Sequence, residues 1–74
     1  MVSEIKFELR GEFVALCDLL KLAGIADSGG AGKALVAAGE VSVDGQTESR
    51  KTAKIRAGQR VVCRGVTVLV KPQD

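Results

Sequence analysis

The chain has 74 residues, a formal net charge of +2 and 46% hydrophobic residues, which suits one small globular domain with a modest core. It contains no histidine, so it lacks the commonest general base near neutral pH and the commonest protein ligand for metals. The composition therefore argues against an enzyme and against a cofactor, and Asp18 and Lys21 interrupt the best apolar run before it reaches membrane-spanning length.

The chain begins with a segment that predicts a strand. Residues 4–10, EIKFELR, alternate strictly, so Ile5, Phe7 and Leu9 would share one face and the charged residues the other. We expect this strand to be half-buried, with its apolar face against the core.

From Phe13 the period changes to that of a helix. The apolar residues are spaced i, i+3, i+4 and i+7: Phe13, Leu16, Cys17 and Leu20. Gly24 suits the position just after the last turn. Phe7 and Phe13 would then both lie on apolar stripes, so we expect neither ring to be available for stacking on a base.

Residues 27–39, DSGGAGKALVAAG, predict a second short helix. Ser28 is a good N-cap, because its hydroxyl can accept a hydrogen bond from an amide of the first turn, and Gly39 is a good stop. Lys33 would point away from the first helix. The residues expected to pack closely on the first helix share one face: Ala31, Ala34, Leu35 and Ala38.

The rest of the chain predicts two β-hairpins. Asp44-Gly45 lies between extended segments and favours a two-residue turn. A second turn is expected near Arg64-Gly65, although arginine is unfavourable at positive φ, so a longer turn is an alternative. A two-residue turn would form two buried cross-strand pairs, Cys63–Val66 and Val61–Val68.

These elements predict an α+β fold in which two short packed helices accompany a small, mostly antiparallel β-sheet. We expect residues 1–74 to form one domain, with no linker, repeat or low-complexity tract. We also expect Cys17 and Cys63 to be buried and reduced, and the chain to be cytoplasmic, since the segment MVSEIKFELR has no apolar signal-peptide core.

The glycines before Lys33 look like half of a nucleotide-binding P-loop, G-x-x-x-x-G-K-[ST]. Aligning Gly32-Lys33 with that motif puts Asp27 in place of the first glycine and Ala34 in place of the magnesium-binding hydroxyl. Both replacements argue against a nucleotide. A helix N-terminus nevertheless presents unpaired amides and the positive end of the helix dipole, so another phosphate could bind there.

The charge is distributed unevenly along the chain. Residues 1–49 carry four basic and eight acidic side chains, whereas residues 50–74 carry seven basic and one acidic. This asymmetry indicates a polyanionic partner. A solvated basic edge that keeps exposed strands from pairing would produce the same pattern, so charge alone leaves both interpretations open.

The order of elements, together with the segments LCDLLKLAGIADSGGAGK and GEVSVDGQTESRKTAKIRAGQ, resembles the αL RNA-binding motif of the ribosomal protein S-four-like superfamily. Within that superfamily the segments are similar to small stand-alone bacterial proteins of the YbcJ type. The resemblance covers residues 13–70. It implies that the two helices and the following hairpin form a compact surface for structured RNA, often ribosomal RNA.

Carried onto this chain, the resemblance implies an RNA-binding surface at the second helix and after the first hairpin: Ser28, Gly29, Gly30, Lys33, Arg50, Lys51 and Lys54. The chain departs from the family at two places. Gly29 stands where most members have arginine, which weakens the helix-start contact, and Gly58-Gln59 replaces a Gly-Asp pair in what looks like a structural position.

We therefore expect a non-catalytic RNA-binding protein that recognises structured, in particular ribosomal, RNA through phosphate and shape contacts. We expect it to be a monomer with no membrane association and no small-molecule substrate. The alternative is a protein-interaction module that docks its basic edge on an acidic partner protein. At the second helix, the alternative is that Ser28 only caps and the glycines only make room for the first helix.

Overall fold

The alternating segment at the start of the chain forms a strand, as its pattern predicts. In the computed structural model, which describes residues 3–72, β1 spans Ser3–Leu9 and pairs in parallel with β7, Val66–Pro72, with Ile5 opposite Val68. The other elements follow in chain order: β2 (Val14–Ala15), α1 (Leu16–Leu22), α2 (Gly29–Ala37), β3 (Val41–Val43), β4 (Gln46–Thr47), β5 (Lys54–Ile55) and β6 (Arg60–Cys63).

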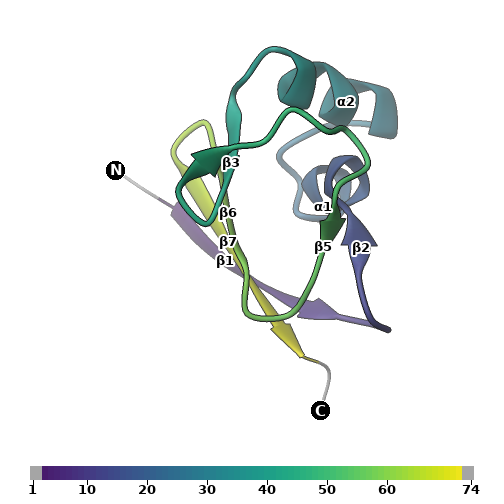
Figure 1. Ribbon diagram of the computed structural model, residues 1–74, viewed down its shortest axis with the longest axis vertical. Helices are drawn as coiled ribbons and strands as arrows, with labels where there is room; N and C mark the ends of the chain where they lie inside the picture. The colour runs from purple at the N-terminus through teal and green to yellow at the C-terminus, as the bar shows by residue number, and fades with distance from the viewer. Residues whose placement is uncertain (1–2, 73–74) are drawn as a thin grey trace.

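The strands form one larger sheet and one separate pair. The larger sheet has five strands in the order β1-β7-β6-β3-β4, and its β1–β7 pair is parallel while the others are antiparallel. β2 and β5 pair separately, next to α1 (Figure 1). Both helices lie on the same side of the larger sheet. The predicted α+β class, with two short helices and a mostly antiparallel sheet, is confirmed.

Side chains from the helices and the sheet meet in one apolar core. Leu16, Leu19 and Leu20 of α1 are fully buried against sheet residues such as Val61 and Val68. Each such side chain contributes about 1.5–3 kcal/mol by leaving water. Both cysteines are buried and free, as expected. Burial raises the pKa of the Cys63 thiol, which keeps it protonated and unreactive near neutral pH.

Both predicted hairpins have two-residue turns. Asp44 and Gly45 adopt φ values of 52° and 87°, so both turn residues are left-handed, as the favoured hairpin turn requires. Arg64 and Gly65 do the same, at 52° and 77°, so the longer turn considered for this hairpin does not occur. The predicted cross-strand pairs are confirmed: Val61–Val68 and Cys63–Val66.

The first helix begins later than the apolar spacing predicts. α1 starts at Leu16 because Val14 and Ala15 are extended and pair with β5. Phe13 therefore precedes the helix, and its side chain is 43% exposed. The expectation that Phe13 belongs to the buried stripe and is unavailable for stacking is wrong, because the pairing with β5 moves it out of the helix.

The second helix is capped at both ends as predicted, but a different face is buried. The Ala31 amide donates to the Ser28 hydroxyl at 3.1 Å, and Gly39 is left-handed at φ 76°. The predicted buried face, formed by Ala31, Ala34, Leu35 and Ala38, is wrong in part, because Ala34 and Ala38 are exposed. The buried residues of the helix are instead Gly32, Leu35 and Val36.

Gly32 determines how closely the two helices approach. A Cβ atom built at Gly32 would lie 2.6 Å from the backbone oxygen of Cys17, a distance that real Cβ atoms essentially never show. The contacting atom belongs to the main chain of α1, so it cannot move aside as a flexible side chain would. The close packing expected from small residues is thus provided by this glycine rather than by the alanines.

We predict that Gly32→Ala destabilises the protein by roughly 1–3 kcal/mol, because the steric conflict with Cys17 exceeds the gain in helix propensity. Gly29→Ala is the matched control, since a Cβ at Gly29 meets nothing within 4 Å. It should be neutral or stabilising by up to about 1 kcal/mol. Urea unfolding of both variants measures the difference, and equal stabilities would contradict the assigned helix contact.

Candidate nucleic-acid interface

The start of α2 presents an open stretch of backbone. The Ser28 hydroxyl accepts a hydrogen bond from one amide of the first turn. Gly30 and Lys33 are exposed, and Gly29 is half-buried. No Cβ covers the backbone at Gly29 or Gly30, and the space around a Cβ at Gly29 is empty. An anion can therefore approach the amides at this end of the helix closely.

The basic segment after the first hairpin, residues 50–54, is held in position by hydrogen bonds of its own backbone. α1 has no side-chain N-cap, and its first amides are satisfied by this segment: the Leu16 amide donates to the Ala53 oxygen at 2.9 Å and the Cys17 amide to the Lys51 oxygen at 3.1 Å. The carbonyls of the segment thus face α1. The side chains of Lys51 and Lys54 are exposed to solvent.

Cys17 connects the two groups of residues predicted to bind RNA. Its amide bonds to Lys51 in the basic segment, and its carbonyl oxygen contacts Gly32 in the first half of α2. The start of α2 and residues 50–54 therefore both lie against the first turn of α1. Figure 1 shows the segment between β3 and β5 passing beside both helices before it enters β5.

Arg50 differs from its neighbours because it is already paired. Its Nε and Nη2 atoms donate to the two carboxylate oxygens of Glu48 at 3.2 and 3.0 Å, and its backbone amide donates to Glu48 at 3.0 Å. The side-chain bonds from Arg50, followed by the amide bond, lower the pKa of Glu48 to about 2. Arg50 is therefore neutralised by an acid that lies just before the basic segment in the sequence.

Phe13, which the sequence pattern predicted to be buried on the first helix, lies beside the end of the basic segment. The β2–β5 register sets Ala15 opposite Lys54, which brings Phe13 beside the β5 end. Lys54 Nζ is 5.0 Å from the centre of the Phe13 ring, and Arg56 Cζ is 5.9 Å from it. In the sequence, the apolar residue Ile55 between charged Lys54 and Arg56 was the available signal for this short strand.

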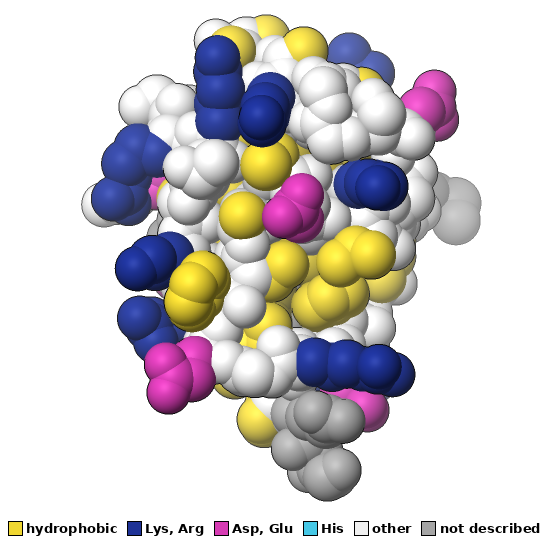
Figure 2. Space-filling view, turned by 90° about the vertical axis from the view of Figure 1, so that its right-hand side faces the viewer, with side chains coloured by type: hydrophobic (Ala, Val, Ile, Leu, Met, Phe, Trp, Pro, Cys, Tyr) yellow, Lys and Arg dark blue, Asp and Glu magenta, His cyan; other side chains and the backbone are white. Residues whose placement is uncertain are grey.

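Figure 2 shows the side of the molecule that carries α1 and the β2–β5 pair. Lys and Arg side chains follow one edge of this side from the helices downward, and hydrophobic side chains gather in a hollow beside them. The hollow is a groove of about 550 Å³ along β1 and the end of α1. Positive charge and apolar surface therefore lie next to each other on this side.

In the final hairpin, Arg64 is paired through its side chain, whereas Arg60 forms a hydrogen bond through its backbone amide. Arg64 Nε and Nη2 donate to the Glu40 carboxylate at 3.1 and 3.2 Å. The Arg60 amide donates to Asp44 at 3.0 Å. Gln59, which replaces the aspartate usual in the family, accepts a hydrogen bond from the Arg56 amide at 2.7 Å, in agreement with a structural role.

Within residues 3–72, no three His, Cys, Asp or Glu side chains are placed to hold a metal ion. Over the same residues, neither helix has the length and apolar character needed to cross a membrane.

We predict that the Glu48–Arg50 pair stabilises the protein near neutral pH and loses this contribution in acid. The pKa of Glu48 falls from an ordinary 4.5 to about 2 on folding, so its contribution is complete above pH 4.5 and is lost as the pH falls toward 2. In Arg50→Gln, NMR titration of the Glu48 carboxyl should show a pKa returned toward 4.5. A pKa near 4.5 in the unchanged protein would mean that the pair does not form in solution.

Comparison with known proteins agrees with this geometry. The S4 domain profile matches residues 7–71. The "Putative RNA-binding protein YbcJ" of Escherichia coli is 53% identical over 57 residues, which are 77% of this chain and 81% of the relative, and YbcJ of Shigella flexneri matches to the same extent. The solution structure of YbcJ from E. coli, described as revealing an αL motif involved in RNA binding, superposes with a TM-score of 0.72 at 46% identity and covers 96% of this chain and 91% of that one. The chain therefore belongs to the S4-domain family and has the fold of the αL motif.

Proposed function

We propose that this protein is a non-catalytic RNA-binding protein that recognises structured RNA, in particular ribosomal RNA, through phosphate and shape contacts. Residues 1–74 act as a single RNA-binding domain and as a monomer. The binding surface comprises the start of α2 and the basic segment: Ser28, Gly29, Gly30, Lys33, Arg50, Lys51 and Lys54. The relatives named above, described as RNA-binding, support this assignment to RNA.

The observation that carries the proposal is the shared contact at Cys17. An extended polyanion such as an RNA backbone needs several positive groups at fixed spacings, and these groups must be held by something other than their own flexible side chains. Main-chain contacts link Cys17 to both Lys51 and Gly32, so the basic segment and the start of α2 both adjoin the first turn of α1. We propose that a phosphate backbone passing this turn meets both.

Charge pairing favours lysines as the principal contacts. Within residues 3–72 the ion pairs are Arg50–Glu48 and Arg64–Glu40, so Lys33, Lys51 and Lys54 remain available for phosphates. Arg50 contributes less than its position suggests, since Glu48 already binds its guanidinium group through two nitrogen atoms. The cytoplasm is the proposed location, because two free buried cysteines and an RNA partner both suit it.

We predict that Lys51→Ala and Lys54→Ala each weaken binding to a structured RNA almost equally for different sequences. Loss of one phosphate contact should flatten the plot of log affinity against log salt by about 0.7–0.9. Lys33→Ala should have a smaller effect, because the charge lies one turn inside α2. The measurement is RNA affinity at several salt concentrations for each folded variant.

Two further variants serve as controls. Arg64→Ala should change the affinity least, because Glu40 already neutralises this arginine at the far hairpin. Glu48→Gln should raise the affinity and steepen the salt dependence, because it releases Arg50. An effect of Arg64→Ala as large as that of Lys51→Ala would place the RNA on the final hairpin and refute the proposed surface. Binding to cell extract that survives nuclease treatment would favour an acidic protein partner instead.

We predict that Gly29→Asp lowers RNA affinity without lowering stability. The new carboxylate would occupy the position proposed for a phosphate, yet negative charge at a helix start stabilises the helix. The space around the Gly29 Cβ is open, so the side chain fits. Gly29→Asn is the matched control of the same size without charge, and its affinity should exceed that of Gly29→Asp. Equal affinities would remove the start of α2 from the site.

A further inference from the structure

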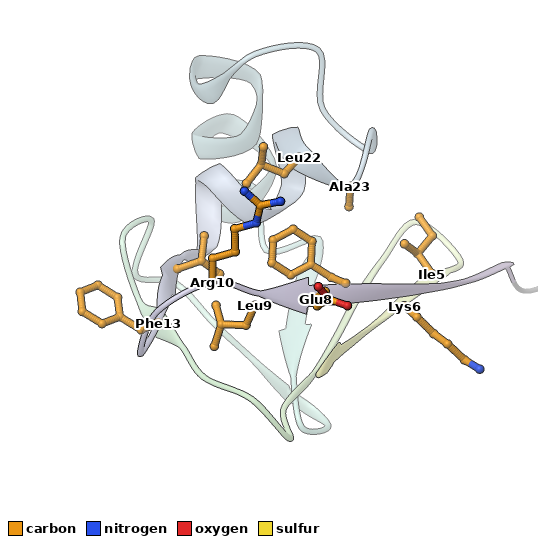
Figure 3. Close-up of a pocket in the computed structure, with 10 residues that line it drawn as sticks. Ile5, Lys6, Glu8, Leu9, Arg10, Phe13, Leu22 and Ala23 are labelled. Carbon is orange, nitrogen blue, oxygen red and sulfur yellow. The ribbon is translucent and has the colours of Figure 1, made fainter. Parts of the chain in front are cut away.

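Phe13 is an exposed aromatic ring that two positive side chains approach. Its side chain is 43% exposed, although it is one of only two aromatic residues in the chain. Phe13 lies at the rim of the groove along β1, and the close-up in Figure 3 shows its ring directed away from Leu9, Leu22 and Ala23, which also line that groove. The ring therefore contributes little to the apolar core, and its position calls for another explanation.

The short β2–β5 pair fixes the geometry around this ring. Val14 lies opposite Ile55 and Ala15 opposite Lys54, so the backbone beside Phe13 is tied to β5. Ile55 is buried, whereas Lys54 and Arg56 point outward and approach the ring at 5.0 and 5.9 Å. The aromatic surface is thus placed beside a hydrogen-bonded strand pair, with one cation from β5 and another from the residue that follows it.

We propose that Phe13, Lys54 and Arg56 form a stacking platform for an unpaired base of the bound RNA. The inference rests on the proposed function and adds the class of RNA that the surface selects, namely a stem that carries an unpaired nucleotide beside it. The base stacks on the Phe13 ring, the planar guanidinium of Arg56 stacks or binds at its edge, and Lys54 binds the adjoining phosphate.

The existing contacts of the ring leave it open to a base. Exposed cation–π contacts are weak, and base–aromatic stacking is stronger, so a base can displace a cation from the ring face. A displaced Lys54 or Arg56 stays within reach of the phosphates on either side of that base. Lys54 also belongs to the basic segment, so RNA that follows this segment reaches Phe13 directly.

A tryptophan probe tests the platform. The chain has no tryptophan, so Phe13→Trp introduces a single fluorophore that a stacked base should quench. Leu22→Trp is the matched control, because Leu22 is an apolar residue of α1 that is 62% exposed and lines the same groove as Phe13. A stem with a short unpaired 3′ extension should quench the fluorescence of the Phe13→Trp protein and leave that of the Leu22→Trp protein nearly unchanged. Equal quenching of both proteins would place the RNA in the groove and overturn the proposal.

Affinity measurements give an independent test that does not depend on the probe. The unchanged protein should prefer the extended stem to the same stem with blunt ends, and Phe13→Leu should reduce that preference by roughly 5- to 100-fold. Leucine keeps an apolar side chain at this site, and the far-ultraviolet spectrum and melting temperature check the fold. If Phe13→Leu weakens both RNAs equally, or the unchanged protein shows no preference, the platform is refuted while RNA binding stands. If neither RNA binds at any salt concentration, the proposed function itself fails, and the platform with it.

Discussion

The contact between Gly32 and the Cys17 carbonyl is the constraint on which the candidate surface depends. No side chain fits between the two helices at this point, so the backbone of α2 lies directly against the first turn of α1. The amide of the same cysteine is bonded to Lys51, and its side chain is buried. Neither α2 nor the basic segment can shift without moving a residue anchored in the core.

In this arrangement the main chain positions the basic segment, and its side chains are left to bind a partner. Main-chain contacts place the basic segment, so the lysine side chains need not hold it and remain in solvent. Two acidic residues then refine the charge pattern, with Glu48 pairing Arg50 and Glu40 pairing Arg64. These pairs reduce the charge available from Arg50 and Arg64, whereas Lys51 and Lys54 of the basic segment have no acidic partner among the ion pairs of residues 3–72.

The two-residue strands β2 and β5 have effects well beyond their length. Their pairing delays the start of α1 to Leu16 and turns Phe13 outward beside Lys54 and Arg56. The segment that leads into β5 supplies the carbonyls that replace a side-chain cap on α1. A pair this short is stable only because Ile55 is buried in the core beneath it. The aromatic and basic parts of the surface are therefore joined by the same small element.

Local patterns in the sequence determined the features that depend on near neighbours. The alternation of residues 4–10, the Ser28 cap, the glycines that end both helices and the two left-handed turns all follow from side chains a few positions apart, and all are present. The motifs in order also identified the αL fold. Tertiary structure alone decided the start of α1, the use of Gly32 rather than alanines at the helix contact, and the exposure of Phe13. Each of these features depends on a partner from a distant segment of the chain. Whether Phe13 continues a helix or flanks a strand, for example, is decided by β5, about 40 residues further along the chain. The spacing of the apolar residues around Phe13 contains no information about that partner.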